Sequence, residues 1–184
     1  MGNGSAGLNI PNLITLGRLV LVPTIVWLLI ADFYVLSFWL FVVAGISDSI
    51  DGFLARQLNA MTELGAYLDP LADKALLVSI YVVLGVKTEI PVWLAVMVVS
   101  RDVVIIGAFL LAWIIDKPVD VRPLAVSKAN TFAQIVLAGV VLAALASGYE
   151  LVPARTILVA IVAILTVGSA AAYLVSWAHH TARD

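Results

Sequence analysis

The chain has 184 residues, of which 63% are hydrophobic and 12% are charged, and its mean hydropathy is +1.11. A soluble domain has about 25% charged residues, so this composition excludes an ordinary soluble protein and indicates a polytopic membrane protein. The net charge of −2 argues against a nucleic-acid partner, and the absence of cysteine excludes disulfides, a thiolate nucleophile and a cysteine zinc site.

Six apolar runs bounded by polar, Gly or Pro residues predict six membrane-spanning helices in one all-α bundle. We expect them at roughly 12–30, 34–56, 64–86, 91–115, 124–147 and 153–178. The bundle forms a single domain over residues 9–184, and residues 1–8 are expected to be a disordered tail or a cloning remnant. Pro11 suits the first turn of a helix, and residues 8–13 are expected either to lie along the membrane surface or to be a frayed terminus.

Basic residues are distributed unevenly over the two predicted faces of the membrane. If both termini are cytoplasmic, the cytoplasmic face carries Arg18, Arg56, Lys74, Lys117, Arg122, Lys128 and Arg183, and the other face carries only Lys87 and Arg155. The positive-inside rule therefore predicts cytoplasmic termini. The absence of an Arg-rich, acid-poor leader favours a bacterial inner membrane over an organelle.

Three polar residues, Asn12, Thr15 and Arg18, recur at helical spacing on one face of the first predicted helix. One interpretation is a capped helix start with a snorkelling arginine. The other is that they bind substrate.

Four aspartates, Asp48, Asp51, Asp69 and Asp73, lie in a short stretch of an otherwise apolar chain. A charged Asp at the centre of a membrane helix costs about 2.5 to 3.5 kcal/mol, so the group needs compensation. Spacings of three and four residues place each pair on one helix face, and the second and third predicted helices are antiparallel neighbours. The two pairs are therefore expected to meet at the cytoplasmic ends of these helices.

Oxygen-only ligation selects hard divalent cations, and four close carboxylates favour two ions, Mg²⁺ or Mn²⁺, over one. Ion pairs with Arg56 and Lys74 are the structural alternative, but two bases do not balance four acids. Gly52 and Ala55 leave the helix face beside the acids without bulk, and the guanidinium of Arg56 suits a phosphate.

This stretch resembles the signature of the CDP-alcohol phosphotransferase family at every fixed position. The matching residues are Asp48, Asp51, Gly52, Ala55, Arg56, Gly65, Asp69 and Asp73. The resemblance implies that Asp48, Asp51 and Asp69 hold two metals, and that Asp73 completes the second site and acts as general base. It also implies that Gly52, Ala55 and Arg56 line the cytidine and phosphate pocket of the CDP-linked lipid and that Asn12, Thr15 and Arg18 bind the same substrate. A homodimer is a further implication of the resemblance.

Arg101 and Asp102 lie near the middle of the fourth apolar run, where an ion needs a partner or a cavity. They either neutralise each other or place Arg101 at an anionic headgroup. Lys128 and Asn130 start the fifth helix in a polar stripe. We expect Arg101, Lys128 and Asn130 to bind the acceptor.

The Arg101–Asp102 pair and the polar residues 127–134 resemble the eukaryotic-type cardiolipin synthases, which implies transfer of a phosphatidyl group from CDP-diacylglycerol to phosphatidylglycerol. A phosphatidylglycerophosphate synthase acting on glycerol 3-phosphate is the alternative. Asn130 stands where those enzymes have a second lysine, and one cation fewer suits a monoanionic lipid. A divalent-cation or proton-coupled transporter is an alternative of a different class, although the chain has one acidic cluster and no counterpart in its second half.

Overall fold

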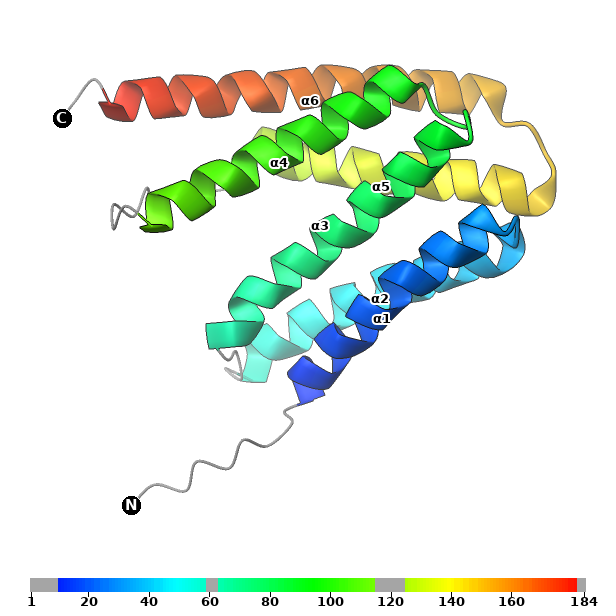
Figure 1. Ribbon diagram of the computed structural model, residues 1–184, viewed down its shortest axis with the longest axis horizontal. Helices are drawn as coiled ribbons and strands as arrows, with labels where there is room; N and C mark the ends of the chain where they lie inside the picture. Colours follow the sequence, from blue (N-terminus) through cyan, green and yellow to red (C-terminus); the bar gives the residue numbers. More distant parts are fainter. Residues whose placement is uncertain (1–9, 59–62, 115–124, 182–184) are drawn as a thin grey trace. The chain divides into compact units, whose positions relative to one another are not determined.

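The computed structural model describes residues 10–58, 63–114 and 125–181, and these ranges consist of helices joined by short turns (Figure 1). The helices are α1 (Ile10–Ile30), α2 (Tyr34–Leu58), α3 (Glu63–Val86), α4 (Val92–Ile114), α5 (Ala125–Ser147) and α6 (Val152–Thr181). Each of the six predicted helices is confirmed, and no end departs from its predicted position by more than three residues. The apolar runs therefore determine where the chain is helical.

The first helix starts earlier than predicted. Helix α1 begins at Ile10 and continues without a break to Ile30. Pro11 fits this start because the first-turn N–H groups of a helix have no intrahelical partner in any case. Residues 10–13 therefore belong to α1, residues 8 and 9 lie outside the described residues, and the position of this segment at the membrane surface stays a prediction.

The chain divides into two compact units, Met1–Ser79 and Ile80–Asp184, with the boundary inside α3. In the first unit α1 packs against α2, and Ile25 and Leu29 of α1 are fully buried. In the second unit α6 packs against both α4 and α5 (Figure 1). The second unit has a continuous apolar core, which includes Ile80, Leu84, Ile90, Leu94, Val98, Leu137, Leu142 and Val162.

Short turns with one left-handed residue follow α1, α3 and α5. These residues are Asp32 with φ 64°, Thr88 with φ 61° and Gly148 with φ 72°. After α3 the backbone N–H of Glu89 donates to the carbonyl of Leu84 at 2.9 Å, which is the bond that closes a Schellman C-cap. Each of these turns reverses the direction of the chain within a few residues.

Two helical stretches of the described residues, Ala125–Ser147 and Val152–Tyr173, are long and apolar enough to cross a membrane. Shorter apolar helices cover Val20–Ile30, Tyr34–Ser47 and Lys74–Val86. Only 17% of the most apolar window of Val152–Tyr173 is buried within the structure. A helix in the core of a soluble protein would bury most of such a stretch, so this exposed apolar surface is consistent with contact with lipid.

Helices α3 and α4 approach closely at one pair of small residues. A Cβ atom added to Gly85 would lie 2.9 Å from the Cβ of Ala95. Both residues are buried, and their neighbours Leu84 and Leu94 are fully buried. The α3–α4 contact therefore requires glycine at position 85 as long as alanine occupies position 95.

We expect Gly85→Ala to destabilise the protein by about 1–3 kcal/mol, because the added methyl group overpacks this contact. The measurement is thermal or denaturant unfolding of the protein purified in detergent. Ala95→Gly removes the opposing methyl group, so the double variant Gly85→Ala/Ala95→Gly should regain most of the lost stability. Equal stability of Gly85→Ala and the wild type would contradict the close approach.

Candidate functional site

The four aspartates of the predicted metal site lie on two helices. Asp48 and Asp51 belong to α2, and Asp69 and Asp73 belong to α3. The backbone is helical at all four positions, so separations of three and four residues place each pair on one helix face. The structure describes no side chains over residues 48–73, so the contacts of these carboxylates stay a prediction.

The bounds of α2 and α3 place the two pairs at matching distances from the connection between the helices. Asp48 lies ten residues before the end of α2 at Leu58, and Asp73 lies ten residues after the start of α3 at Glu63. At 1.5 Å per residue both are about 15 Å from the connected ends. Asp51 and Asp69, seven and six residues from the same ends, are about 10 Å away. An antiparallel arrangement of α2 and α3 would therefore bring the acids together at two levels.

This donor set suits hard divalent cations, because carboxylates from two helices supply only oxygen ligands. Elsewhere in the described part of the chain, no group of three or more His, Asp or Glu residues could hold a metal ion. The aspartates thus form the candidate metal site.

The other residues predicted to bind the CDP-linked lipid also lie on helices. Asn12, Thr15 and Arg18 are in α1, at the helical spacing that was predicted, and the motif residues Gly52, Ala55 and Arg56 are in α2. The structure confirms their helical setting. The structure does not describe the side chains of these residues, so their role in binding stays a prediction.

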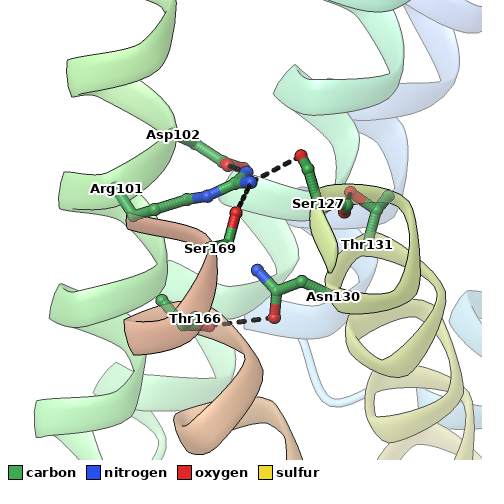
Figure 2. Close-up of polar contacts among 7 residues, drawn as sticks. All are labelled: Arg101, Asp102, Ser127, Asn130, Thr131, Thr166 and Ser169. Carbon is green, nitrogen blue, oxygen red and sulfur yellow. Dashed lines mark hydrogen bonds and ion pairs between the residues drawn. The ribbon is translucent and has the colours of Figure 1, made fainter. Parts of the chain in front are cut away.

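A second polar site, the Arg101 cluster, is fully described and lies within the second unit (Figure 2). It is centred on Arg101 and Asp102 of α4, whose side chains are 4% and 1% exposed. Its other members are Ser127 and Asn130 of α5 and Thr166 and Ser169 of α6.

Three partners hold the guanidinium of Arg101. Its Nη1 atom donates to Asp102 Oδ1 at 2.6 Å, and its Nη2 atom donates to Ser127 Oγ at 2.6 Å and to Ser169 Oγ (Figure 2). The guanidinium carbon also lies 5.8 Å from the ring centroid of Tyr173, within the range of a cation–π interaction. The sequence left two roles open for Arg101, and in this structure it forms the ion pair with Asp102.

Asn130 joins the same cluster, whereas Lys128 does not. Thr166 Oγ1 donates to Asn130 Oδ1 at 3.0 Å, and Asn130 is fully buried (Figure 2). Lys128 is exposed, because residues two apart on a helix point to nearly opposite sides. Of the three predicted acceptor-binding residues, the fold therefore brings only Arg101 and Asn130 together.

Gln134 extends the polar surface of α5 by one turn beyond Asn130. It is fully buried, and Tyr81 Oη of α3 donates to its backbone carbonyl at 3.2 Å. Four buried side-chain atoms in this region have no hydrogen-bond partner: Arg101 Nε, Asn130 Nδ2, Gln134 Nε2 and Gln134 Oε1. Buried polar groups are usually paired with protein or with ordered water, so these four atoms form an unsatisfied polar region in the described part of the chain.

Sequence reasoning missed the contribution of α6 to this cluster. Thr166, Ser169 and Tyr173 are separated by three and four residues and therefore share one helix face. Such a polar stripe in an apolar helix should face protein and not lipid, and this was the signal available.

Comparison with known proteins places the chain in a family. Residues 8–174 match the CDP-alcohol phosphatidyltransferase family. A human cardiolipin synthase (CMP-forming) is 35% identical over 73% of this chain and 50% of the relative. A CDP-diacylglycerol–glycerol-3-phosphate 3-phosphatidyltransferase of Bacillus subtilis is 33% identical over 70% of this chain and 73% of the relative. A rice chloroplastic protein described by the same activity is 35% identical over 71% of this chain and 45% of the relative.

The chain spans about half the length, or less, of the first curated relatives it matches. The family match, in contrast, covers nearly the whole chain and includes both aspartate pairs on α2 and α3. The resemblance first indicated by the aspartate motif is thereby confirmed, and the chain belongs to the CDP-alcohol phosphatidyltransferase family.

Proposed function

We propose that this protein transfers the phosphatidyl group of CDP-diacylglycerol to phosphatidylglycerol, forming cardiolipin and releasing CMP. The observation that carries the proposal is the complete aspartate motif on α2 and α3, within a family match over residues 8–174. The relatives named above support phosphatidyl transfer to a glycerol-containing acceptor.

The transfer is a displacement at one phosphorus atom. An acceptor hydroxyl oxygen attacks the phosphorus next to the lipid, and a new O–P bond forms. The bond from that phosphorus to the oxygen bridging to CMP breaks, and its electron pair leaves with CMP. Asp73 accepts the proton of the attacking hydroxyl, for which it must keep an oxygen that is not tightly bound to a cation.

Asp48, Asp51, Asp69 and Asp73 would hold two divalent cations, Mg²⁺ or Mn²⁺. When bound, these ions neutralise negative charge on the pyrophosphate and on the leaving CMP. Asn12, Thr15 and Arg18 of α1 and Gly52, Ala55 and Arg56 of α2 would bind the nucleotide and phosphates of the donor. The small residues allow close approach to the helix backbone, and the arginines offer donors that fit phosphate oxygens.

Phosphatidylglycerol is the preferred acceptor because the Arg101 cluster has little positive charge to offer. Asp102 pairs with Arg101, and Lys128 is exposed on another side of α5. The phosphate of glycerol 3-phosphate is largely a dianion at neutral pH and would need more cationic partners than that of phosphatidylglycerol. Glycerol 3-phosphate is nevertheless the second candidate, because two of the relatives are described by that activity.

The proposed setting is a membrane crossed six times, with both termini and the aspartates at the cytoplasmic face. The two long apolar helical stretches and the exposed apolar surface of α6 support it. The relatives come from a bacterium, a plant chloroplast and an animal, and a bacterial inner membrane and a homodimer stay predictions.

We expect Asp69→Asn to lower phosphatidyl transfer by about 1000-fold or more, because it would remove an anionic ligand of the proposed metal pair. The measurement is CMP release from CDP-diacylglycerol by purified protein with magnesium or manganese. Glu89→Gln is the matched control, since it also converts an acid to an amide, at the turn after α3, and should keep wild-type activity. Metal-driven ion flux in vesicles without CMP release would favour a transporter and contradict the proposal.

A panel of acceptors should separate the two candidate reactions. With phosphatidylglycerol, glycerol 3-phosphate, inositol phosphate and serine offered separately, we expect CMP release with phosphatidylglycerol and cardiolipin as the product in lipid mass spectrometry. The physical reason is the charge balance of Arg101 and Asp102. Product formation from glycerol 3-phosphate alone would establish the second candidate and leave the proposed metal site unaffected.

A further inference from the structure

The outer side of α5 carries a cation and two large apolar side chains near the start of the helix. Lys128 is exposed, Phe132 is 69% exposed and Ile135 is 41% exposed. Separations of four and seven residues place all three on one side of α5. Asn130 and Leu137, which are fully buried, lie on the opposite side. Lys128, Phe132 and Ile135 therefore form an outward surface of the second unit, the Lys128 face.

The charge of Lys128 is not compensated in the described part of the chain. Its ammonium group forms no hydrogen bond or ion pair there, and α5 contains no acidic residue. The other basic side chains that the structure describes all interact with further groups: Lys74, Lys87, Arg101 and Arg155. Lys128 is thus the described cation that is left to pair with a group outside the chain.

The order of these residues along α5 matches the order of groups in a phospholipid. Lys128 lies in the first turn, and Phe132 and Ile135 follow about 6 and 10 Å further along the helix axis. The stretch Ala125–Ser147 is long and apolar enough to cross a membrane, and in the proposed setting it begins at the cytoplasmic face. A phospholipid of that leaflet presents its phosphate near the membrane surface and its acyl chains deeper, so both parts meet matching side chains.

The charge of the face distinguishes between kinds of lipid. A zwitterionic headgroup carries its own cation beside its phosphate, whereas an anionic lipid brings the net negative charge that Lys128 needs. We propose that the Lys128 face binds anionic phospholipids of the surrounding bilayer, with the phosphate at Lys128 and the acyl chains on Phe132 and Ile135. This inference rests on the membrane setting of the proposed function. It gives Lys128 a role at the lipid surface in place of the predicted contact with the acceptor.

A photoreactive reporter within the Lys128 face tests which molecules lie against it. The reporter p-benzoylphenylalanine replaces Phe132, whose exposure leaves room for the larger side chain. The protein is reconstituted in vesicles with equal amounts of phosphatidylserine and phosphatidylcholine of the same acyl chains and is irradiated. Mass spectrometry of the peptide that carries the reporter then measures the ratio of the two lipid adducts. We expect phosphatidylserine to be enriched about fivefold, as for one lysine near an anionic headgroup.

Three substitutions in the reporter protein separate charge from other effects. Lys128→Gln should reduce the enrichment to about one, and Lys128→Arg should keep it, because only the first removes the charge. Lys87→Gln is the matched control, since it removes the same charge from a lysine that already has a partner, and it should keep the enrichment. High salt should lower the enrichment in the protein with Lys128.

Two results would overturn the proposal. One is an unchanged enrichment of phosphatidylserine in Lys128→Gln. The other is a reporter that forms adducts with protein in place of lipid, since a second copy or another segment of the chain would then cover the face.

Cross-linking needs no turnover, so this inference and the proposed function fail separately. If no acceptor supports CMP release, phosphatidyl transfer is excluded while the enrichment still tests the Lys128 face. Phosphatidylglycerol in place of phosphatidylserine should give the same enrichment, because the face recognises negative charge. Dependence on Lys128 with phosphatidylglycerol alone would overturn the proposal, because Lys128 would then recognise the headgroup of the acceptor.

Discussion

Arg101 can lie inside the second unit because Asp102 neutralises it and two serines accept hydrogen bonds from its Nη2 atom. Breaking a buried ion pair by removing one partner typically costs roughly 3–5 kcal/mol, because it leaves an uncompensated charge in an apolar surrounding. Arg101 also connects three helices, since its partners lie on α4, α5 and α6. The packing of α6 against both α4 and α5 is therefore coupled to the pairing of this one cation.

The two polar sites of this chain differ in how their charges are balanced. The four aspartates on α2 and α3 outnumber the bases of their stretch, so they would need external cations, which would suit a charged pyrophosphate. In the Arg101 cluster the cation is paired with Asp102, and three of the four unpaired buried atoms belong to the amides of Asn130 and Gln134. The aspartate stretch thus has an excess of acids, whereas the cation of the Arg101 cluster is paired with an acid.

The sequence predicted the helices well because the apolar runs are long and their boundaries are marked by polar residues, Gly and Pro. The start of α1 was predicted two residues too late, although Pro11 was correctly expected to suit a first helical turn. Lys128 and Asn130 were grouped by their nearness in sequence. The helix separates them, because two residues correspond to about 200° of rotation.

The identity of the family was determined by the sequence alone, because the aspartate motif depends on residue types at fixed helical spacing, and local periodicity is sufficient to place each pair on one face. The choice of partner for Arg101 was not. Neighbouring residues on a helix point about 100° apart, so the sequence allowed both an ion pair with Asp102 and a bound headgroup, and the headgroup was the prediction. Only the packing of α6 against α4 and α5 places Ser127 and Ser169 at the guanidinium and leaves the amides of Asn130 and Gln134 unpaired, because these contacts join residues far apart in the chain.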